Sequence, residues 1–284
     1  MQSLRENIHI EDKYLGVTLA AINLPQGLIY IDAPPSPEDG RTWRADLLDL
    51  ESGYERLLIN LDTNIDRIIG SRAMDCSVLV HENTAEHFRN RPGIFKNQGQ
   101  PTGAIWETFP TLGNLRWSPP QITFTKKMSL YWDDAPIYLE HQPGSDEGAI
   151  WVILPDEKIV FVGDAVLKNQ PPFLAKADLH KWLESLDLLL GEEYKGYTVV
   201  SGRGGVCASS TIEKQREILA ETHQALEKMA QKGADAADTA KLIPELLAPL
   251  RFLASERELF TNRLRYGLAA YYTRHYLGVI PEQE

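Results

Sequence analysis

The chain has 284 residues, of which 43% are hydrophobic and 24% are charged. This is ordinary globular composition, which excludes collagen-like, disordered and coiled-coil chains. The formal net charge of −11 at pH 7 would repel a phosphate backbone, and no dense group of lysines and arginines offsets it, so nucleic acid is excluded as a general partner.

Cysteine content and the N-terminal segment indicate the compartment. Two cysteines, Cys76 and Cys207, are too few for a disulfide scaffold and are typical of a reducing environment. Residues 1–13 carry charges throughout and lack the apolar core of a signal peptide. No run approaches the roughly 18 consecutive apolar residues that a membrane-spanning helix needs. We therefore expect a cytoplasmic protein that does not contact a membrane.

Short apolar, β-rich runs bounded by turn residues predict strands in the first half of the chain. They cover residues 16–23, 28–32, 57–61 and Ser77–His81. Ser36 with Pro37 behind it predicts a helix start after the second run. From about residue 90 to 120 proline and glycine become frequent, and Phe95, Trp106, Phe109 and Trp117 are interleaved with them. We predict an ordered flap there, with the alternative that its aromatic side chains simply pack beneath the loop.

The second half begins with strands and ends with helices. Strands are predicted at residues 122–125, Ile137–His141, 149–154 and 159–162, the last two forming a hairpin through residues 155–158. Helices are predicted at residues 178–190, 210–232, 235–247 and 256–276, with a capping box at Ser210 and Glu213 and a stop at Gly233. No linker divides the chain, so we expect one domain over residues 1–284, with C-terminal helices at about 210–276.

Three segments place polar residues directly after predicted strands. The first, residues 57–70, continues from a strand into a loop with Asp62, Asn64 and Asp66. The second runs from Pro143-Gly144-Ser145 through Gly148 and the hairpin to Gly163-Asp164. The third, residues 199–204, ends in Gly202-Arg203-Gly204.

In this order and spacing, with residues 29–32 ahead of them, these segments resemble the metallo-β-lactamase superfamily from about residue 16 to the C-terminal helices. The resemblance implies an α/β fold, namely the αββα four-layer sandwich of the metallo-β-lactamase type. In that fold two sheets pack face to face, helices cover their outer faces, and the site lies at one edge of the sheets.

The residues at the superfamily's metal-ligand positions depart from its motifs. The motif His-x-His-x-Asp-His reads here as Asp62-x-Asn64-x-Asp66-Arg67. The histidines of Pro-Gly-His-x-x-Gly and Gly-His-Gly are replaced by Ser145 and Arg203, whereas Gly-Asp is kept as Gly163-Asp164. All five ligand histidines are therefore missing, and the two ligand aspartates, Asp66 and Asp164, remain. His141, four residues before Ser145, is predicted to lie on a strand and not in the loop.

The resemblance implies two metal sites that share Asp164. One would use positions 62, 64 and 145, and the other positions 66, 67 and 203. Arginine has no lone pair to donate and stays charged, so the second site cannot hold a cation. Asp62, Asn64, Ser145 and Asp164 are oxygen donors, which suit Mg²⁺, Ca²⁺ or Mn²⁺ better than zinc; the alternative is that they only bond to one another and to water. We expect no zinc and no other cofactor, with weak Mg²⁺ or Ca²⁺ binding as the exception.

The charges at these positions suggest what replaces the metal. These positions carry negative charges on Asp62, Asp66 and Asp164 and positive charges on Arg67 and Arg203. Buried carboxylates need such a counter-charge. We predict that the two guanidinium groups stand in for the ions. We expect Arg67 to pair with its neighbour Asp66, and Arg203 to have a mixed role in which it both pairs internally and grips an anion. Both arginines are therefore anion-binding candidates.

Several functions fit this sequence, and the balance favours a protein without catalysis. In the first, a degenerate metal site leaves a pocket that binds a small molecule, such as an anion, or a protein partner. The alternative is a hydrolase of an ester, thioester or lactone bond that uses a hard cation or a water activated by Asp66 or Asp164, although arginines beside such a base would lower its pKa and weaken it. A third is a structural subunit that docks through its acidic surface. The ligand and the oligomeric state are not determined by the sequence.

Overall fold

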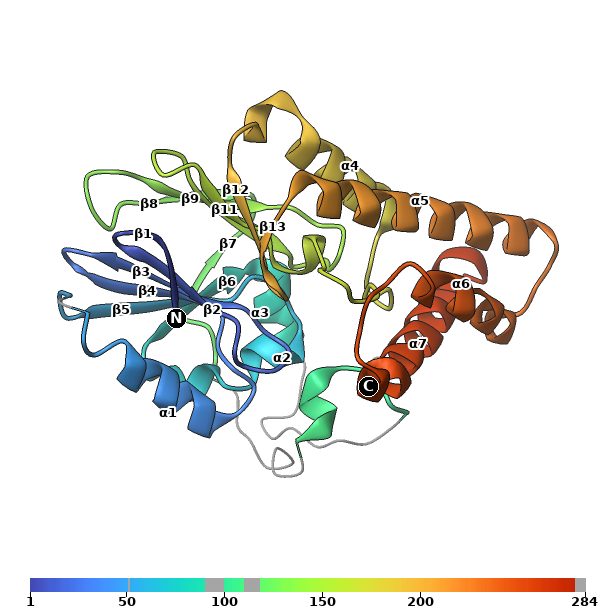
Figure 1. Cartoon of the computed structure of the whole chain (residues 1–284), viewed down its shortest axis with the longest axis horizontal. Coiled ribbons are helices and arrows are strands. Elements are labelled where there is room, and N and C mark those ends of the chain that lie inside the picture. Colours follow the sequence, from blue (N-terminus) through green and yellow to red (C-terminus); the bar gives the residue numbers. More distant parts are fainter. Residues whose placement is uncertain (51, 90–99, 110–117, 279–284) are drawn as a thin grey trace.

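The computed structural model describes residues 1–50, 52–89, 100–109 and 118–278 (Figure 1). Most of the predicted flap, including Phe95 and Trp117, lies outside these residues. The described strands form two sheets that pack face to face, and helices cover the outer face of each sheet (Figure 1).

Within the described residues, the first sheet has seven strands in sequence order, antiparallel from β1 to β4 and parallel from β4 to β7. They are β1 (Gln2–Arg5), β2 (Ile8–Glu11), β3 (Leu19–Leu24), β4 (Gly27–Ile31), β5 (Glu55–Ile59), β6 (Ser77–His81) and β7 (Ile122–Phe124). The second sheet has the order β13-β12-β11-β10-β9-β8 and is antiparallel except between β11 and β12. Its strands are β8 (Lys127–Leu130), β9 (Ile137–His141), β10 (Ile150–Leu154), β11 (Ile159–Phe161), β12 (Thr198–Ser201) and β13 (Gly205–Cys207).

The helices are distributed on both sides of the two sheets and at one end (Figure 1). They are α1 (Pro37–Asp46), α2 (Ile65–Ile68), α3 (Glu82–Arg89), α4 (Leu179–Leu190), α5 (Ser209–Gln231), α6 (Ile243–Leu247) and α7 (Arg257–Tyr276). None of the helices in the described part of the chain combines the length and apolarity needed to cross a bilayer.

Strand β10 shows why the sandwich has four layers. Successive side chains of a strand point to opposite faces of the sheet, and β10 is apolar and buried at every position. Ile150 and Val152 pack against the first sheet, whereas Trp151 and Ile153 pack against the helices that cover the second sheet. On the other side of the molecule, Trp43 of α1 packs on the outer face of the first sheet. The predicted αββα sandwich is confirmed.

Two details of the helices differ from the sequence prediction. The capping box at Ser210 and Glu213 is wrong, because α5 begins one residue earlier, after Ala208, and has no side-chain cap. The helix predicted at residues 235–247 is split into a 3₁₀ segment, Ala236–Leu242, and the short helix α6. Pro244 accounts for the break, since proline has no N–H to continue the hydrogen-bond pattern of the preceding turn. Gly233 has a φ of +66° and ends α5 as predicted.

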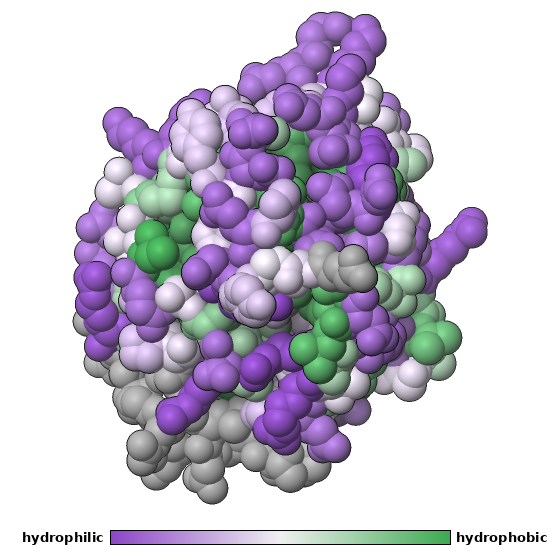
Figure 2. Space-filling view, turned by 90° about the vertical axis from the view of Figure 1, so that its left-hand side faces the viewer, coloured by the Kyte–Doolittle hydropathy of each residue, from purple (hydrophilic) through white to green (hydrophobic). Residues whose placement is uncertain are grey.

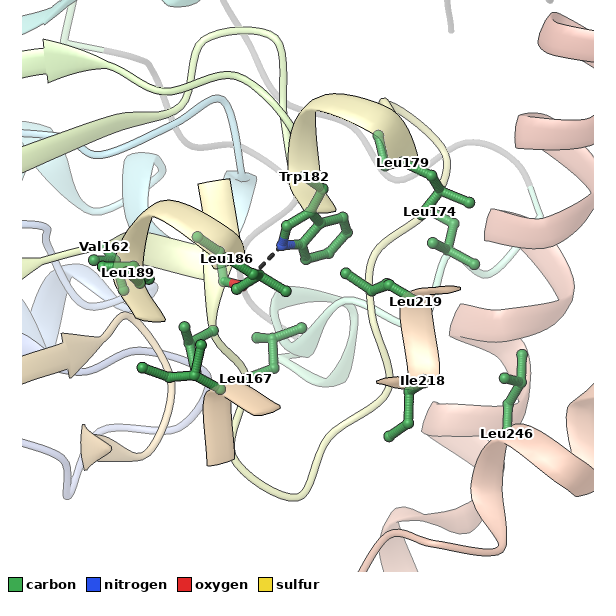
Figure 3. Packing of buried hydrophobic residues seen from close by; sticks show 14 of the residues in the cluster. Val162, Leu167, Leu174, Leu179, Trp182, Leu186, Leu189, Ile218, Leu219 and Leu246 are labelled. Carbon is green, nitrogen blue, oxygen red and sulfur yellow. Dashed lines mark hydrogen bonds between the residues drawn. The ribbon is translucent and has the colours of Figure 1, made fainter. Parts of the chain in front are cut away.

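Trp182 of α4 connects the helical layer to the loops at the sheet edge (Figure 3). Its ring is completely buried, and its Nε1 donates a hydrogen bond of 2.8 Å to the carbonyl oxygen of Ala165, the residue after Asp164. A Cβ on Gly144 would lie 2.6 Å from the Cα of Trp182, so the loop before Ser145 packs directly on the same helix. Helix α4 therefore holds two of the polar loops in place.

The hydrogen bond of Trp182 can be tested against a matched residue. We expect Trp182→Phe to lower the free energy of unfolding by about 2–3 kcal/mol, because it shrinks a core side chain and leaves the Ala165 carbonyl without its donor. Chemical denaturation measures this loss.

Trp151→Phe is the control, because Trp151 is equally buried but its Nε1 has no hydrogen-bond partner. That variant should lose clearly less stability than Trp182→Phe. Equal losses in the two variants would contradict a role for the hydrogen bond.

Candidate functional site

The predicted site residues gather where the strands of the two sheets end. The loop with Asp62, Asn64 and Asp66 follows β5, Asp164 follows β11, and Arg203 follows β12. Direct contacts join these residues to one another and to Arg67. Ser145 lies in the neighbouring loop, which Asp146 ties to the same place by accepting hydrogen bonds from the N–H and hydroxyl of Thr63. His141 ends β9, so it lies on a strand as expected.

Arg67 is completely buried and contacts three carboxylates. Its Nη1 lies 2.9 Å from Oδ2 of Asp32, its Nε lies 3.2 Å from Oδ1 of Asp62, and its Nη2 donates to Oδ1 of Asp164. Burial disfavours the charge, but Asp164, Asp62 and Asp32 raise the pKa of Arg67 well above its ordinary value. The guanidinium group is thus held as a cation in the middle of the site.

Gly202 is required by the position of Arg67. A Cβ at residue 202 would lie 2.3 Å from Nη1 of Arg67, which is closer than real atoms approach. The backbone of the loop after β12 therefore rests directly on the guanidinium group, and only glycine leaves room for it.

Arg203, also fully buried, pairs with the other two aspartates. Its Nε donates to both oxygens of Asp164, at 3.0 and 3.1 Å, and its Nη1 donates to Oδ2 of Asp66 at 2.7 Å. Asp66 also accepts the backbone N–H groups of Ile105 and Trp106. The expected pair between Arg67 and Asp66 does not form. Adjacent residues of a helical turn project in different directions, so Asp66 faces Arg203 while Arg67 faces the other carboxylates.

Asp164 lies between the two guanidinium groups and contacts both. It also accepts a hydrogen bond of 3.2 Å from the side-chain amide of Asn64. Burial would raise its pKa, but Arg203 and Arg67 outweigh burial and lower the pKa of Asp164 below its ordinary value. Asp164 is therefore a firmly ionised carboxylate.

The pKa of Asp62 is shifted in the opposite direction to that of Asp164. Burial, together with the charges of Asp164, Asp146 and Asp32, raises its pKa to about 8, although Arg67 acts in the other direction. Its Oδ1 accepts the N–H of Asn64 at 2.8 Å, but its Oδ2 has no hydrogen-bond partner. Asp62 therefore carries a proton near neutral pH.

Sequence reasoning missed three residues of the site, namely Asp32, Asp146 and Arg263. Asp32 follows β4 directly, has a φ of +60°, and accepts the N–H of Leu61 at 3.0 Å in addition to pairing with Arg67. The position of Asp32 at the end of a strand could have identified it as a site residue, and the position of Asp146 beside Ser145 could have done the same. Arg263 belongs to α7, far away in the sequence, and nothing local to it indicates this site.

The donor set does not fit the metal ions that the resemblance implies. Position 67 and position 203 hold guanidinium groups, which cannot coordinate a cation. In the other set, Asp62 and Asp164 each have an oxygen in contact with Arg67, and the Oδ1 of Asn64 accepts the N–H of Asp66. Among the described residues, no group of three or more histidine, cysteine, aspartate or glutamate side chains is arranged to hold a metal ion.

Comparison with known proteins agrees with this architecture. The sequence model of the metallo-β-lactamase superfamily matches residues 71–198 of the chain. The chain has the metallo-β-lactamase fold. The predicted resemblance to the superfamily is therefore confirmed, while Arg67 and Arg203 both lie outside the matched span. No curated protein sequence matches the chain.

Solved structures show the same fold at low sequence identity. A metallo-β-lactamase family protein from Thermus thermophilus has a TM-score of 0.66 at 16% identity, covering 97% of this chain and 95% of that chain. A stereoselective inverting sec-alkylsulfatase from Pseudomonas sp. has a TM-score of 0.67 at 14% identity, covering 99% of this chain and 50% of that chain. A metallo-β-lactamase from Pontibacter korlensis has a TM-score of 0.57 at 17% identity, covering 77% and 97%. The chain thus spans about half the length of the alkylsulfatase.

The contacts of Arg67 predict a large loss of stability when it is removed. We expect Arg67→Met to lower the free energy of unfolding by about 3–5 kcal/mol, because buried carboxylates are left without their counter-charge. Denaturant unfolding at pH 7 measures the change.

Arg216→Met is the matched control, since Arg216 makes a similar pair with Asp187 on the exposed surface of α5. It should change stability little, because an exposed ion pair is screened by solvent. A loss of that small size for Arg67→Met would show that Arg67 does not neutralise the site.

The raised pKa of Asp62 predicts an unusual pH dependence. Between its unfolded pKa near 4 and its folded pKa of about 8, the folded protein binds a proton that the unfolded chain does not, so this residue's contribution to stability falls as the pH rises. We therefore expect Asp62→Asn to gain stability relative to the wild type from pH 5 to pH 8, by up to about 1.4 kcal/mol per pH unit. Denaturant unfolding across this range measures the slope.

Asp164→Asn provides the contrast. The pKa of Asp164 is lowered, so its own linkage acts only below its unfolded pKa near 4, and this variant should be destabilised from pH 5 to 8. Because the charge of Asp164 raises the pKa of Asp62, the stability of Asp164→Asn should also fall less with rising pH than that of the wild type. A difference between Asp62→Asn and the wild type that does not vary with pH would contradict protonation of Asp62.

Proposed function

We propose that this protein is a non-catalytic relative of the metallo-hydrolases, in which two guanidinium groups replace the metal ions and the remaining function is binding of a small molecule or a partner. The observation that carries the proposal is the position of Asp164. By resemblance, this aspartate would bridge two metal sites, and here it contacts Arg67 on one side and Arg203 on the other. The cations of the site are supplied by the chain itself.

The chemistry of the retained aspartates supports the absence of hydrolysis. Hydrolysis at such a site requires a nucleophilic water, generated by a metal ion or by a general base. Both oxygens of Asp164 accept hydrogen bonds from arginine or asparagine, and its lowered pKa makes it a weak base. Both oxygens of Asp66 accept hydrogen bonds from backbone N–H groups or Arg203. Neither carboxylate has an oxygen that is free to activate water.

One observation favours the alternative, a hydrolase of an ester, thioester or lactone bond. Asp62 has a pKa of about 8 and an Oδ2 without a partner, so it has the proton affinity of a general base or acid near neutral pH. Its side chain is 1% exposed, so a substrate would have to enter a closed site to reach it. In this reading the active carboxylate is Asp62, and not Asp66 or Asp164, which the sequence suggests.

A structural subunit that docks through its surface has less support. The face in Figure 2 is mostly hydrophilic, and its apolar residues are separated from one another. Such a face offers no broad apolar area for a stable interface. Binding within the site is the function that we favour, because buried donors of Arg203 and Arg263 lack partners there.

Metal content and turnover test this proposal together. We expect protein purified without added metal to contain no stoichiometric zinc, iron or manganese by elemental analysis. We also expect chromogenic lactam, thioester, lactone, phosphodiester and secondary alkyl sulfate substrates to turn over no faster than in buffer. Both results follow if guanidinium groups fill the cation positions.

Asp62→Asn and Asp164→Asn identify the source of any turnover that is observed. Activity that resists chelation and disappears in Asp62→Asn would favour the alternative hydrolase. Activity that follows metal content and disappears in Asp164→Asn would overturn the replacement of the metal ions.

A further inference from the structure

A third buried arginine, Arg263 of α7, lies next to the site and has no carboxylate partner in the part of the chain that the structure describes. Its side chain is 1% exposed. Its Nε donates to the carbonyl oxygen of Gly103 at 3.0 Å, and its Nη1 lies 3.2 Å from the amide oxygen of Gln170 and 3.3 Å from the carbonyl oxygen of Pro171. All of these acceptors are neutral. Among the described residues, Arg263 differs in this respect from Arg67 and Arg203, which are both ion-paired.

Arg203 and Arg263 meet at one aromatic ring. The Cζ of Arg203 lies 4.6 Å from the centre of the Phe173 ring, and the Cζ of Arg263 lies 3.8 Å from it, so the two cations are neighbours. The Nη2 of each arginine is buried and has no hydrogen-bond partner. Two charged donors on neighbouring side chains are therefore left unused, although buried donors are nearly always satisfied.

The electrostatic surroundings of Arg263 favour the binding of a negatively charged group. Burial and the charge of Arg203 lower the pKa of Arg263 to about 9, although Asp66 and Asp164 act against the shift. A buried guanidinium group without a paired carboxylate is costly. An anion within reach of both Nη2 atoms would satisfy the two donors and reduce this cost.

We propose that Arg203 and Arg263 form a binding site for the carboxylate group of a small organic acid whose apolar part lies against Phe173. The two free Nη2 groups would each donate to one carboxylate oxygen, a charge-assisted arrangement that arginine favours. This rests on the binding function proposed above and assigns it a ligand class. Arg67 is not part of this site, because all of its guanidinium nitrogens already face carboxylates.

The surroundings favour an organic monoanion over inorganic phosphate. Phe173 packs on an apolar cluster that contains Ile69, Ala104 and Trp106, which suits a hydrocarbon group better than a hydrated ion. A hydrated dianion such as phosphate would therefore be held less well than a carboxylate attached to an apolar group. Phe173 is half-buried, so the ring that both cations contact reaches the surface.

Thermal unfolding of the full chain with different anions tests the site. The probes are sodium benzoate, sodium acetate and sodium phosphate, each compared with sodium chloride at the same ionic strength. We expect benzoate at about ten times its Kd to raise the melting temperature by about 3 °C or more. Acetate should bind more weakly, and phosphate should do no more than chloride. Calorimetric titration of benzoate gives the Kd directly.

Two variants on α7 separate this site from general effects on stability. Arg263→Met should abolish the benzoate shift, and Arg263→Lys, which keeps the charge but not the planar group, should raise the Kd at least about tenfold. Arg274→Met is the matched control, because half-buried Arg274 on the same helix donates to the carbonyl oxygens of Ala175 and Ala177. It should melt earlier than the wild type and keep the full benzoate shift.

The outcomes are distinct from those of the metal and turnover experiment. A wild-type protein that does not respond to benzoate or acetate overturns the carboxylate site and leaves the replacement of the metal ions intact. A larger response to phosphate than to benzoate overturns the assignment to an organic acid. An unchanged benzoate response in both Arg263 variants shows that Arg263 only supports α7.

Discussion

The contact of one aspartate with two arginines is the constraint on which the rest of the site depends. Asp164 is buried and ionised, and its charge is stabilised because Arg67 and Arg203 contact it from two sides. Each arginine then needs its remaining donors satisfied, so Arg67 reaches Asp32 and Asp62 and Arg203 reaches Asp66. Four strand ends from two sheets are connected in this way. The network performs the structural task of cross-linking these loops, a task that metal ions perform in other proteins.

Much of the fold could be predicted, because the signals for it are local. Strands such as Ser77–His81 and Ile137–His141 have the predicted bounds, and α4 begins after Asp178, whose side chain caps it. The N-terminal strands β1 and β2 were missed, because their short segments carry charged or polar side chains among the apolar ones. The break before α6 follows from Pro244, whose effect on the helix the sequence prediction did not include.

The site was predictable to the extent that it follows strand ends in a recognisable order. Motif positions identified six residues that the structure joins by direct contacts, but they did not identify the pairs. The expected partner of Arg67 was its sequence neighbour Asp66, and the actual partners come from β4, the loop after β5 and the loop after β11. Arg263 could not be found from the sequence, because it approaches from a helix near the C-terminus and its importance arises only from what surrounds it.

The two arginines at former ligand positions therefore have different physical roles. Each guanidinium nitrogen of Arg67 lies beside a carboxylate, although its Nε makes no hydrogen bond, and the backbone of Gly202 lies against the group, so Arg67 has no space for a ligand. Arg203 has one donor left over, and this donor is beside a second cation that also has one left over. If arginines replace a dinuclear centre, as we propose, the result is a closed half, which fixes the loops, and a half with unused hydrogen-bonding capacity. Because a guanidinium group attracts anions but cannot activate water as a metal ion does, we propose that the second half binds an acid without hydrolysing it.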